Sequence, residues 1–92
     1  MNDELKIRKR EDFILKSQLM RKRIGIEIKE IRNSKNIRQA ELAFKMGIDE
    51  KNLSDLELGK IDFKFSTILL VAEALEVPVS RFFEVFVYEP SV

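Results

Sequence analysis

The side chains that could do chemistry in this 92-residue chain are carboxylates, lysines and arginines, because the chain contains no histidine and no cysteine. Without histidine, the commonest general base and the commonest metal ligand are missing. Without cysteine, there are no disulfides and no thiolate metal sites. No glycine-rich loop could cradle a phosphate, and the carboxylates and lysines form no catalytic cluster. We therefore expect no catalytic residues, no metal and no cofactor, and a protein that is not an enzyme.

Charge is divided unevenly along the chain, although the net charge is only +1. Residues 1–38 hold 12 Lys and Arg against 6 Asp and Glu, whereas residues 39–92 hold 5 against 10. A basic front half favours attraction to phosphate groups. The alternative is that solvated helix faces are simply charged unevenly.

The composition is that of one small domain. An apolar fraction of 45% is ordinary for a globular protein and allows a modest core. The N-terminus lacks the apolar run of a signal peptide. The longest apolar run, residues 68–72, is far below the roughly 20 residues that span a membrane. We expect a soluble, cytoplasmic protein with no membrane partner.

Two short helices are predicted in the middle of the chain. Leu42, Ala43 and Met46 fall at helical spacing before Gly47, and a second short helix is expected over residues 49–58. A glycine can adopt the left-handed conformation that ends the first helix. Two helices joined in this way are typical of a helix-turn-helix.

Residue types also predict the caps of these two helices. Asp49 suits the N-cap of the second helix. Arg38 cannot accept a hydrogen bond from the free amides of the first helix. Asn36 is therefore expected to cap that helix, with Gln39 three residues further on in an arrangement like a capping box.

The sequence before these helices predicts either one long helix over about residues 11–34 or a short extra helix followed by the first helix of the domain. Continuity is favoured because the cations at residues 21–23 would be unfavourable at a helix N-terminus. One apolar stripe consists of Phe13, Met20, Ile24, Ile28 and Ile31. A neighbouring stripe consists of Leu15, Leu19 and Ile26.

Two further helices are expected after Gly59, over residues 66–75 and 79–83. The residues expected to face inward from the first of them are Leu69, Ala72 and Leu75. Beyond residue 83, Val85 and Val87 alternate with Phe86 and Tyr88, which is the period of two that is typical of a strand.

Four apolar residues near the C-terminus have no obvious place in so small a core: Leu70, Phe82, Phe86 and Tyr88. Either the N-terminal helix covers them or a second subunit does. We predict that the C-terminal segment forms the contact of a symmetric homodimer.

The run from Ile24 to Phe83 resembles the Cro/C1-type (XRE-like) helix-turn-helix domain of bacterial and phage regulators. The matching residues are Ile24, Gly25, Ile28, Ile31, Arg32, Gln39, Glu41, Leu42, Ala43, Gly47, Ile48, Leu53, Leu56, Glu57, Gly59, Lys60, Leu69, Ala72, Ala74, Leu75, Val77 and Phe83. The resemblance implies an all-α, five-helix lambda-repressor-like DNA-binding domain over residues 21–83. Outside it lie a basic, partly helical extension (residues 1–20) and a tail with a strand-like pattern (residues 84–92).

This resemblance implies a sequence-specific transcriptional regulator, a repressor or autoregulator, that binds double-stranded DNA as a homodimer on a palindromic operator. Gln39 matches a position that contacts phosphate from a helix N-terminus, although capping is an alternative role. Arg38, Lys60 and Lys64 are expected to help hold the sugar-phosphate backbone, although exposed lysines also serve solubility. The positions that match base-reading residues are Glu50, Lys51, Ser54 and Asp55.

Two features qualify this expectation. In the family, residues matching Arg32 and Glu57 form a structural ion pair, which we expect here. The outer face of the third helix is acidic, and Glu50 and Asp55 could either accept a hydrogen bond from cytosine or repel phosphate. The alternative is therefore a protein-interaction module on the same fold, such as an antitoxin-like partner with weak DNA binding.

Overall fold

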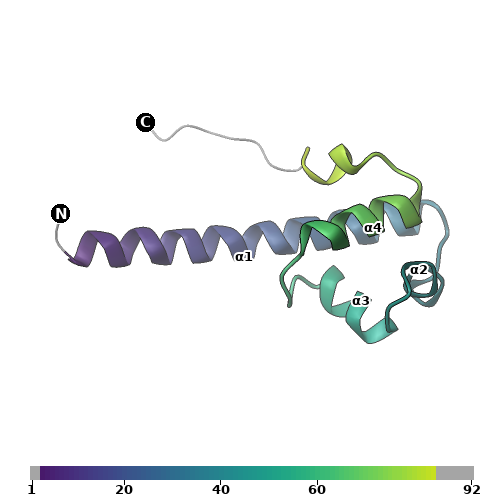
Figure 1. The fold of residues 1–92 in the computed structure, drawn as a ribbon, viewed down its shortest axis with the longest axis horizontal. Coiled ribbons are helices and arrows are strands. Elements are labelled where there is room, and N and C mark those ends of the chain that lie inside the picture. The colour runs from purple at the N-terminus through teal and green to yellow at the C-terminus, as the bar shows by residue number, and fades with distance from the viewer. Residues whose placement is uncertain (1–2, 85–92) are drawn as a thin grey trace.

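The computed structural model describes residues 3–84, which form four α-helices and one short 3-10 helix (Figure 1). The helices are α1 (Asp3–Ser34), α2 (Gln39–Met46), α3 (Glu50–Glu57), α4 (Phe65–Leu75) and the 3-10 helix η1 (Val79–Phe82). No strand occurs between residues 3 and 84, so the described fold is all-α. The expected fifth helix is the four-residue η1, and the tail with the strand-like pattern lies outside the described residues.

Helix α1 is one continuous helix of 32 residues. It begins at Asp3, well before the expected start near residue 11, because the sequence offers no break there. Asp3 and Glu4 lie in its first turn, where negative charge complements the partial positive charge of the helix N-terminus. The cations at residues 21–23 therefore lie inside the helix rather than at the start of a new one.

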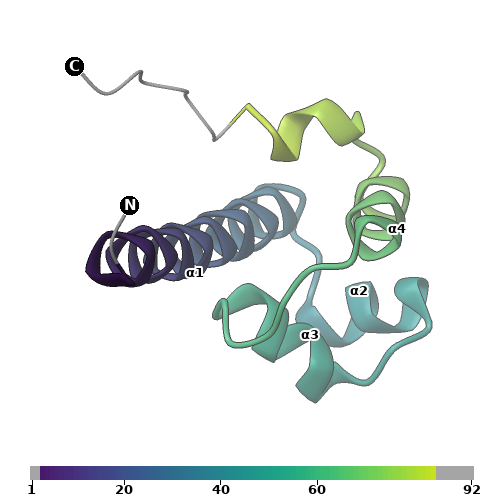
Figure 2. The ribbon, with the colours of Figure 1, turned by 60° about the vertical axis from the view of Figure 1, so that its left-hand side comes forward.

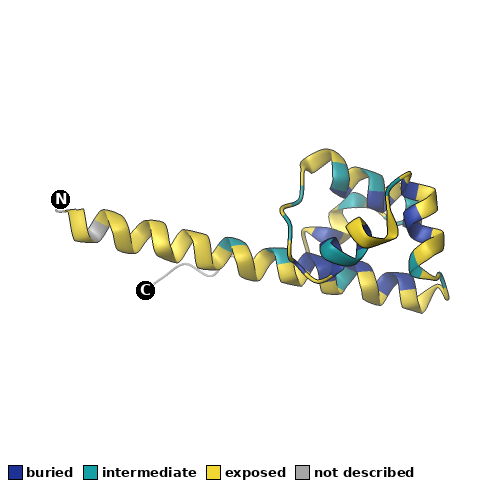
Figure 3. Cartoon of the chain, turned by 90° about the horizontal axis from the view of Figure 1, so that it is seen from below, coloured by how far each residue is buried: buried dark blue, intermediate teal, exposed yellow. Residues whose placement is uncertain are grey.

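The core is built where the C-terminal half of α1 meets the other helices, as the dark blue segments in Figure 3 show. Its buried apolar residues are Ile24, Ile28, Ile31, Leu42, Ala43, Met46, Leu53, Leu56, Ile68, Val71, Ala72, Leu75 and Phe82. The expectation that Leu69 faces inward is wrong, because 43% of it is exposed. Ile68 takes that place, since the buried face of α4 begins one residue earlier.

Phe82 belongs to this core and not to a dimer contact. Its exposed fraction is 0%, because η1 folds back onto α1 and α4. Arg81 Nε donates to Glu27 Oε1 of α1 at 2.9 Å and fastens η1 there. Leu70 is half-buried, and the other two predicted contact residues, Phe86 and Tyr88, lie outside the described residues.

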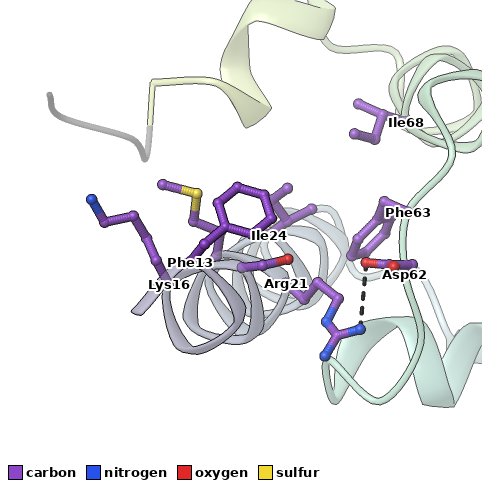
Figure 4. A pocket seen from close by; sticks show the side chains of 9 residues that line it. Phe13, Lys16, Arg21, Ile24, Asp62, Phe63 and Ile68 are labelled. Atoms are coloured by element: carbon purple, nitrogen blue, oxygen red, sulfur yellow. Dashed lines mark ion pairs between the residues drawn. The ribbon is translucent and has the colours of Figure 1, made fainter. Parts of the chain in front are cut away.

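The N-terminal half of α1 projects away from the core (Figures 1 and 2). Where it leaves, a groove of about 330 Å³ separates it from the segment that precedes α4 (Figure 4). The groove is mainly apolar, with Phe13 and Met20 on one side and Phe63 on the other. Arg21 Nη1 reaches Asp62 Oδ1 at 3.4 Å. None of the helices within residues 3–84, α1 included, combines the length and apolar character of a membrane span.

Candidate nucleic-acid interface

Helices α2 and α3 are joined by a turn centred on Gly47. This glycine has φ +71°, a left-handed conformation that residues with a Cβ rarely adopt. The N–H groups of Gly47 and Ile48 donate to the carbonyls of Phe44 and Ala43 at 3.1 and 3.0 Å. Ala43 is buried, and α2 packs closely on α3. These contacts produce the helix-turn-helix arrangement that the sequence predicts.

A buried network fixes the relative positions of α1, α2 and α3. Arg32 binds Glu57 through two parallel hydrogen bonds, Nε to Oε2 at 2.7 Å and Nη2 to Oε1 at 3.0 Å. Its Nη1 also donates to the carbonyl of Ile37 at 3.0 Å. Only 7% of Arg32 and 5% of Glu57 are exposed. The expected ion pair is therefore present, and it satisfies both charges inside the protein.

Gln39 joins the same network from the first residue of α2. Its Nε2 donates to Glu57 Oε1 at 3.0 Å, a contact that the sequence did not predict. The amide nitrogen carries a second hydrogen, and the residue is only half-buried. Gln39 can therefore hold Glu57 with one hydrogen and offer the other to an anion near the N-terminus of α2.

The outward face of α3 carries the four predicted base-reading residues. Leu53 and Leu56 are buried beneath it. Lys51 and Glu50 are exposed, while Ser54 and Asp55 are half-buried. Lys51 Nζ lies 3.7 Å from Asp55 Oδ2, one helical turn away. The carboxylate of Asp55 is thus partly neutralised by a neighbour on the same face, which lowers its repulsion of phosphate.

The predicted caps differ from those in the structure. Asn36 does not cap α2: it has φ +56° and lies in the turn after α1. Arg38 occupies the N-cap position of α2 without a side-chain hydrogen bond, so the amides there remain open. Asp49 occupies the N-cap position of α3, as expected, but its side chain makes no capping bond either.

The predicted phosphate-binding residues are accessible. Arg38, Lys60 and Lys64 are exposed. Lys60 follows Gly59, whose φ of +71° turns the chain out of α3, and the Lys60 N–H donates to the carbonyl of Asp55 at 2.9 Å. Lys64 immediately precedes α4. These cations therefore lie just before α2 and along the loop that follows α3.

Two further exposed residues were not among the predicted site residues. Asn52 is exposed on α3, and its amide is of the type that pairs with adenine. Its position next to Lys51 on the predicted second helix could have identified it as a further base-contacting residue. Phe44 on α2 is 87% exposed and lies off the face of Leu42, Ala43 and Met46 that the sequence pattern marks.

Comparisons with known proteins agree with this geometry. A helix-turn-helix family model matches residues 28–82, more than half of the chain. The chain therefore belongs to the helix-turn-helix family, in its XRE-type branch of transcription regulators. No curated protein matches the chain.

Several solved structures are similar. The restriction-modification controller protein C.AhdI from Aeromonas hydrophila has 29% identity and a TM-score of 0.65, over 67% of this chain and 94% of that chain. The clp gene regulator ClgR from C. glutamicum has 25% identity and a TM-score of 0.69, over 71% and 84%. The controller protein C.Esp1396I, solved as a tetramer with its natural 35 base-pair operator, has 29% identity and a TM-score of 0.66, over 72% and 87%.

Proposed function

We propose that this protein is a sequence-specific regulator of transcription that binds a palindromic operator as a homodimer and acts as a repressor or autoregulator. The observation that carries the proposal is the network of Arg32, Gln39 and Glu57. It ties the start of α2 to the end of α3 and leaves the outer face of α3 free. A recognition helix needs this rigidity, because bidentate contacts to base edges require a fixed orientation.

The roles of the exposed residues follow from their chemistry. Arg38, Lys60 and Lys64 would bind phosphates and set the position of the domain, while the second amide hydrogen of Gln39 would donate to a phosphate at the N-terminus of α2. Lys51 would donate to guanine. The remaining predicted residues on the outer face of α3, Glu50, Ser54 and Asp55, and also Asn52, would complete the reading of the bases.

Similar proteins support an operator as the ligand. C.Esp1396I binds its operator as a tetramer, and C.AhdI is a controller of the same kind. Carried over to this chain, the likeness makes a DNA-binding controller the best-supported function. A dimer would place two recognition helices on two half-sites about 34 Å apart.

The salt dependence of DNA binding tests this assignment. The variants Lys60→Ala and Lys64→Ala each remove one proposed phosphate contact, so each should weaken binding to all sequences and lower the slope of log affinity against log salt by about 0.9. Lys9→Ala, on the projecting part of α1, is the matched control and should leave the slope unchanged. Equal slopes for all variants and the native protein would contradict the proposed interface.

The second candidate is a protein-interaction module on the same fold, such as an antitoxin-like partner. The acidic residues on α3 and the exposed Phe44 favour it. Such a module would bind DNA weakly, without the steep loss of affinity between 50 and 200 mM salt that phosphate binding requires. Measured binding in that range therefore distinguishes the two candidates.

A further inference from the structure

The projecting half of α1 carries exposed apolar residues that form a stripe, and the stripe extends into the domain as far as Ile26. Leu15, Leu19 and Ile26 are 56%, 55% and 44% exposed, and their spacing places them on one side of the helix. Figure 3 shows this half of α1 as almost wholly exposed. Phe13 and Met20 line the groove, and at about 100° per residue they lie on a different side of α1 from the stripe; Figure 4 shows Phe13 at the groove. The stripe is therefore a separate surface.

Arg8 and Asp12 extend the stripe toward the N-terminus, and Lys22, which also lies beside Gly59, fills the gap between Leu19 and Ile26. The spacing then alternates between four and three residues, which places side chains along one face of paired helices. The members of the stripe in order are Arg8, Asp12, Leu15, Leu19, Lys22 and Ile26. When a second copy of this helix runs in the opposite direction, its stripe places a suitable partner opposite each residue. Leucines occupy the middle, and an acidic and a basic residue stand at equal distances on either side of them.

We infer that two copies of this chain pair in antiparallel orientation along this stripe, which would form the dimer contact that the proposed function requires. Leu15 of each copy packs on Leu19 of the other. Asp12 then lies opposite Lys22 of the second copy, and the aliphatic stem of Arg8 lies on Ile26. The leucine contact and the opposite-charge contact each occur twice, as two-fold symmetry demands.

The charges within the stripe favour the antiparallel orientation. In a parallel pair each residue meets its own counterpart, so Asp12 would face Asp12 and Lys22 would face Lys22. Like charges placed directly opposite each other disfavour that arrangement. The basic residues Lys9, Lys16 and Arg23 follow one edge of the stripe, and in the antiparallel pair this edge meets the same edge of the second copy. Their long side chains can extend into solvent, but this edge opposes pairing, so the leucine contacts and the contacts of Asp12 with Lys22 must outweigh it.

The direction of α3 agrees with such a pair. Helix α3 packs on α1 at Gly25, where a Cβ would meet the Glu57 carbonyl oxygen, and through Arg32. At roughly 100° per residue, these positions lie between about a quarter and a third of a turn from the stripe. The two-fold axis of an antiparallel pair is perpendicular to the plane that contains both helices. Rotation about this axis keeps both α3 helices on the same side of the dimer, as binding to one DNA duplex requires.

The register also sets the distance between the two domains. Helix α3 and the turn that follows it are attached to α1 between Lys22, beside which Gly59 lies, and Arg32, which binds Glu57. The centre of this attachment is near residue 27. In the inferred register the two centres lie 20 residues apart along the pair, or about 30 Å. This matches the roughly 34 Å between half-sites on one face of DNA.

Cross-linking between engineered thiols tests the pairing directly, because the native chain has no cysteine. Asp12→Cys mixed with Lys22→Cys should give a covalent dimer containing one chain of each kind when treated with a short thiol-reactive linker. Either variant alone should give little product, since equivalent positions lie about 15 Å apart. No excess of the mixed product, or efficient linking of one variant to itself, would overturn the inference.

Sedimentation of the full chain without DNA provides the second test. Leu15→Glu combined with Leu19→Glu should convert the dimer to a monomer. Ile7→Glu combined with Ile14→Glu, at exposed apolar positions off the stripe, should leave the dimer intact. A native protein that sediments as a monomer, or a dimer that survives the Leu15 and Leu19 changes, would overturn the inference.

Binding to a duplex with a single half-site separates this inference from the proposed function. The Leu15→Glu, Leu19→Glu variant should keep its half-site affinity and lose only the gain that a palindrome provides. If the native protein does not bind any half-site, the proposed function fails, whatever the result of cross-linking.

Discussion

At the residue scale, Glu57 is the side chain on which most of the site depends. It accepts hydrogen bonds from Arg32 of α1 and from Gln39 of α2 while belonging to the end of α3. A single buried carboxylate thus joins three elements. Replacing one member of such a network leaves a charge without a partner in a medium of low polarity.

Arg32→Met should therefore lower the free energy of unfolding by about 3–5 kcal/mol. Arg32→Met combined with Glu57→Met should recover most of that loss, because the buried charges are then removed together. Urea unfolding of both variants and the native protein measures the effect. A single variant within about 0.5 kcal/mol of the native protein would contradict the role given to this pair.

The sequence predicted that Arg32 pairs with Glu57, but neither the bond from Arg32 to the carbonyl of Ile37 nor the contact of Lys51 with Asp55. The pair was predictable because Arg32 and Glu57, 25 residues apart, match two positions that form an ion pair in the family that the sequence resembles. The contact of Lys51 with Asp55 depends on which rotamers two surface side chains adopt. The same holds for the caps: residue type favoured Asn36, but the backbone of the turn placed it in the left-handed conformation instead.

At the element scale, the close packing of α1 on α3 depends on Gly25. A Cβ at this position would lie 2.3 Å from the carbonyl oxygen of Glu57 and 2.6 Å from that of Leu56. Both atoms belong to the backbone, so neither can move without shifting α3. The glycine allows the end of the recognition helix to rest directly on α1.

Gly25→Ala should thus lower the free energy of unfolding by at least about 2 kcal/mol through overpacking, and it should weaken DNA binding by displacing α3. Gly47→Ala is the matched control, since a Cβ there meets no atom within 4 Å and costs only about 1–2 kcal/mol for its left-handed backbone. Thermal or urea unfolding measures both variants. A Gly25→Ala variant that is more stable than the control would contradict the packing argument.

The elements were predictable to different degrees. Periodicity and glycine positions located α2, α3 and α4, because each buries one face against the core. The fifth element was expected as a helix but is a 3-10 turn, and Phe82, expected outside, fills the core. The sequence did not reveal this, because whether an aromatic residue near a chain end packs inward depends on how η1 folds back onto α1.

At the scale of the whole molecule, the chain divides into a domain with a core and a helix that projects from it. Among the residues whose burial the structure describes, those of the core lie at Ile24 or beyond. Even Phe13, beside the groove, is 72% exposed. The projecting half of α1 therefore contributes little to the stability of the domain.

Deletion of residues 2–16 should leave the free energy of unfolding of the domain within about 1 kcal/mol of the native value. The same deletion should abolish dimerisation, since it removes Asp12 and Leu15 from the stripe. Urea unfolding at a concentration where the native protein is monomeric measures stability, and sedimentation measures assembly. A truncated protein that still dimerises would contradict pairing through α1 and would favour the contact predicted from the sequence, in the C-terminal segment that contains Phe86 and Tyr88.

The most direct test of the account is selection of bound duplexes from a randomised library of about 30 base pairs, at moderate salt. The native protein is compared with a variant carrying Gln39→Ala and Lys51→Ala, both of which leave Arg32 and Glu57 paired. The account predicts enrichment of a palindrome whose half-sites lie about one helical turn apart, and loss of that enrichment in the variant. If the native protein enriches no sequence and the variant behaves identically, the helix-turn-helix of this chain does not read DNA.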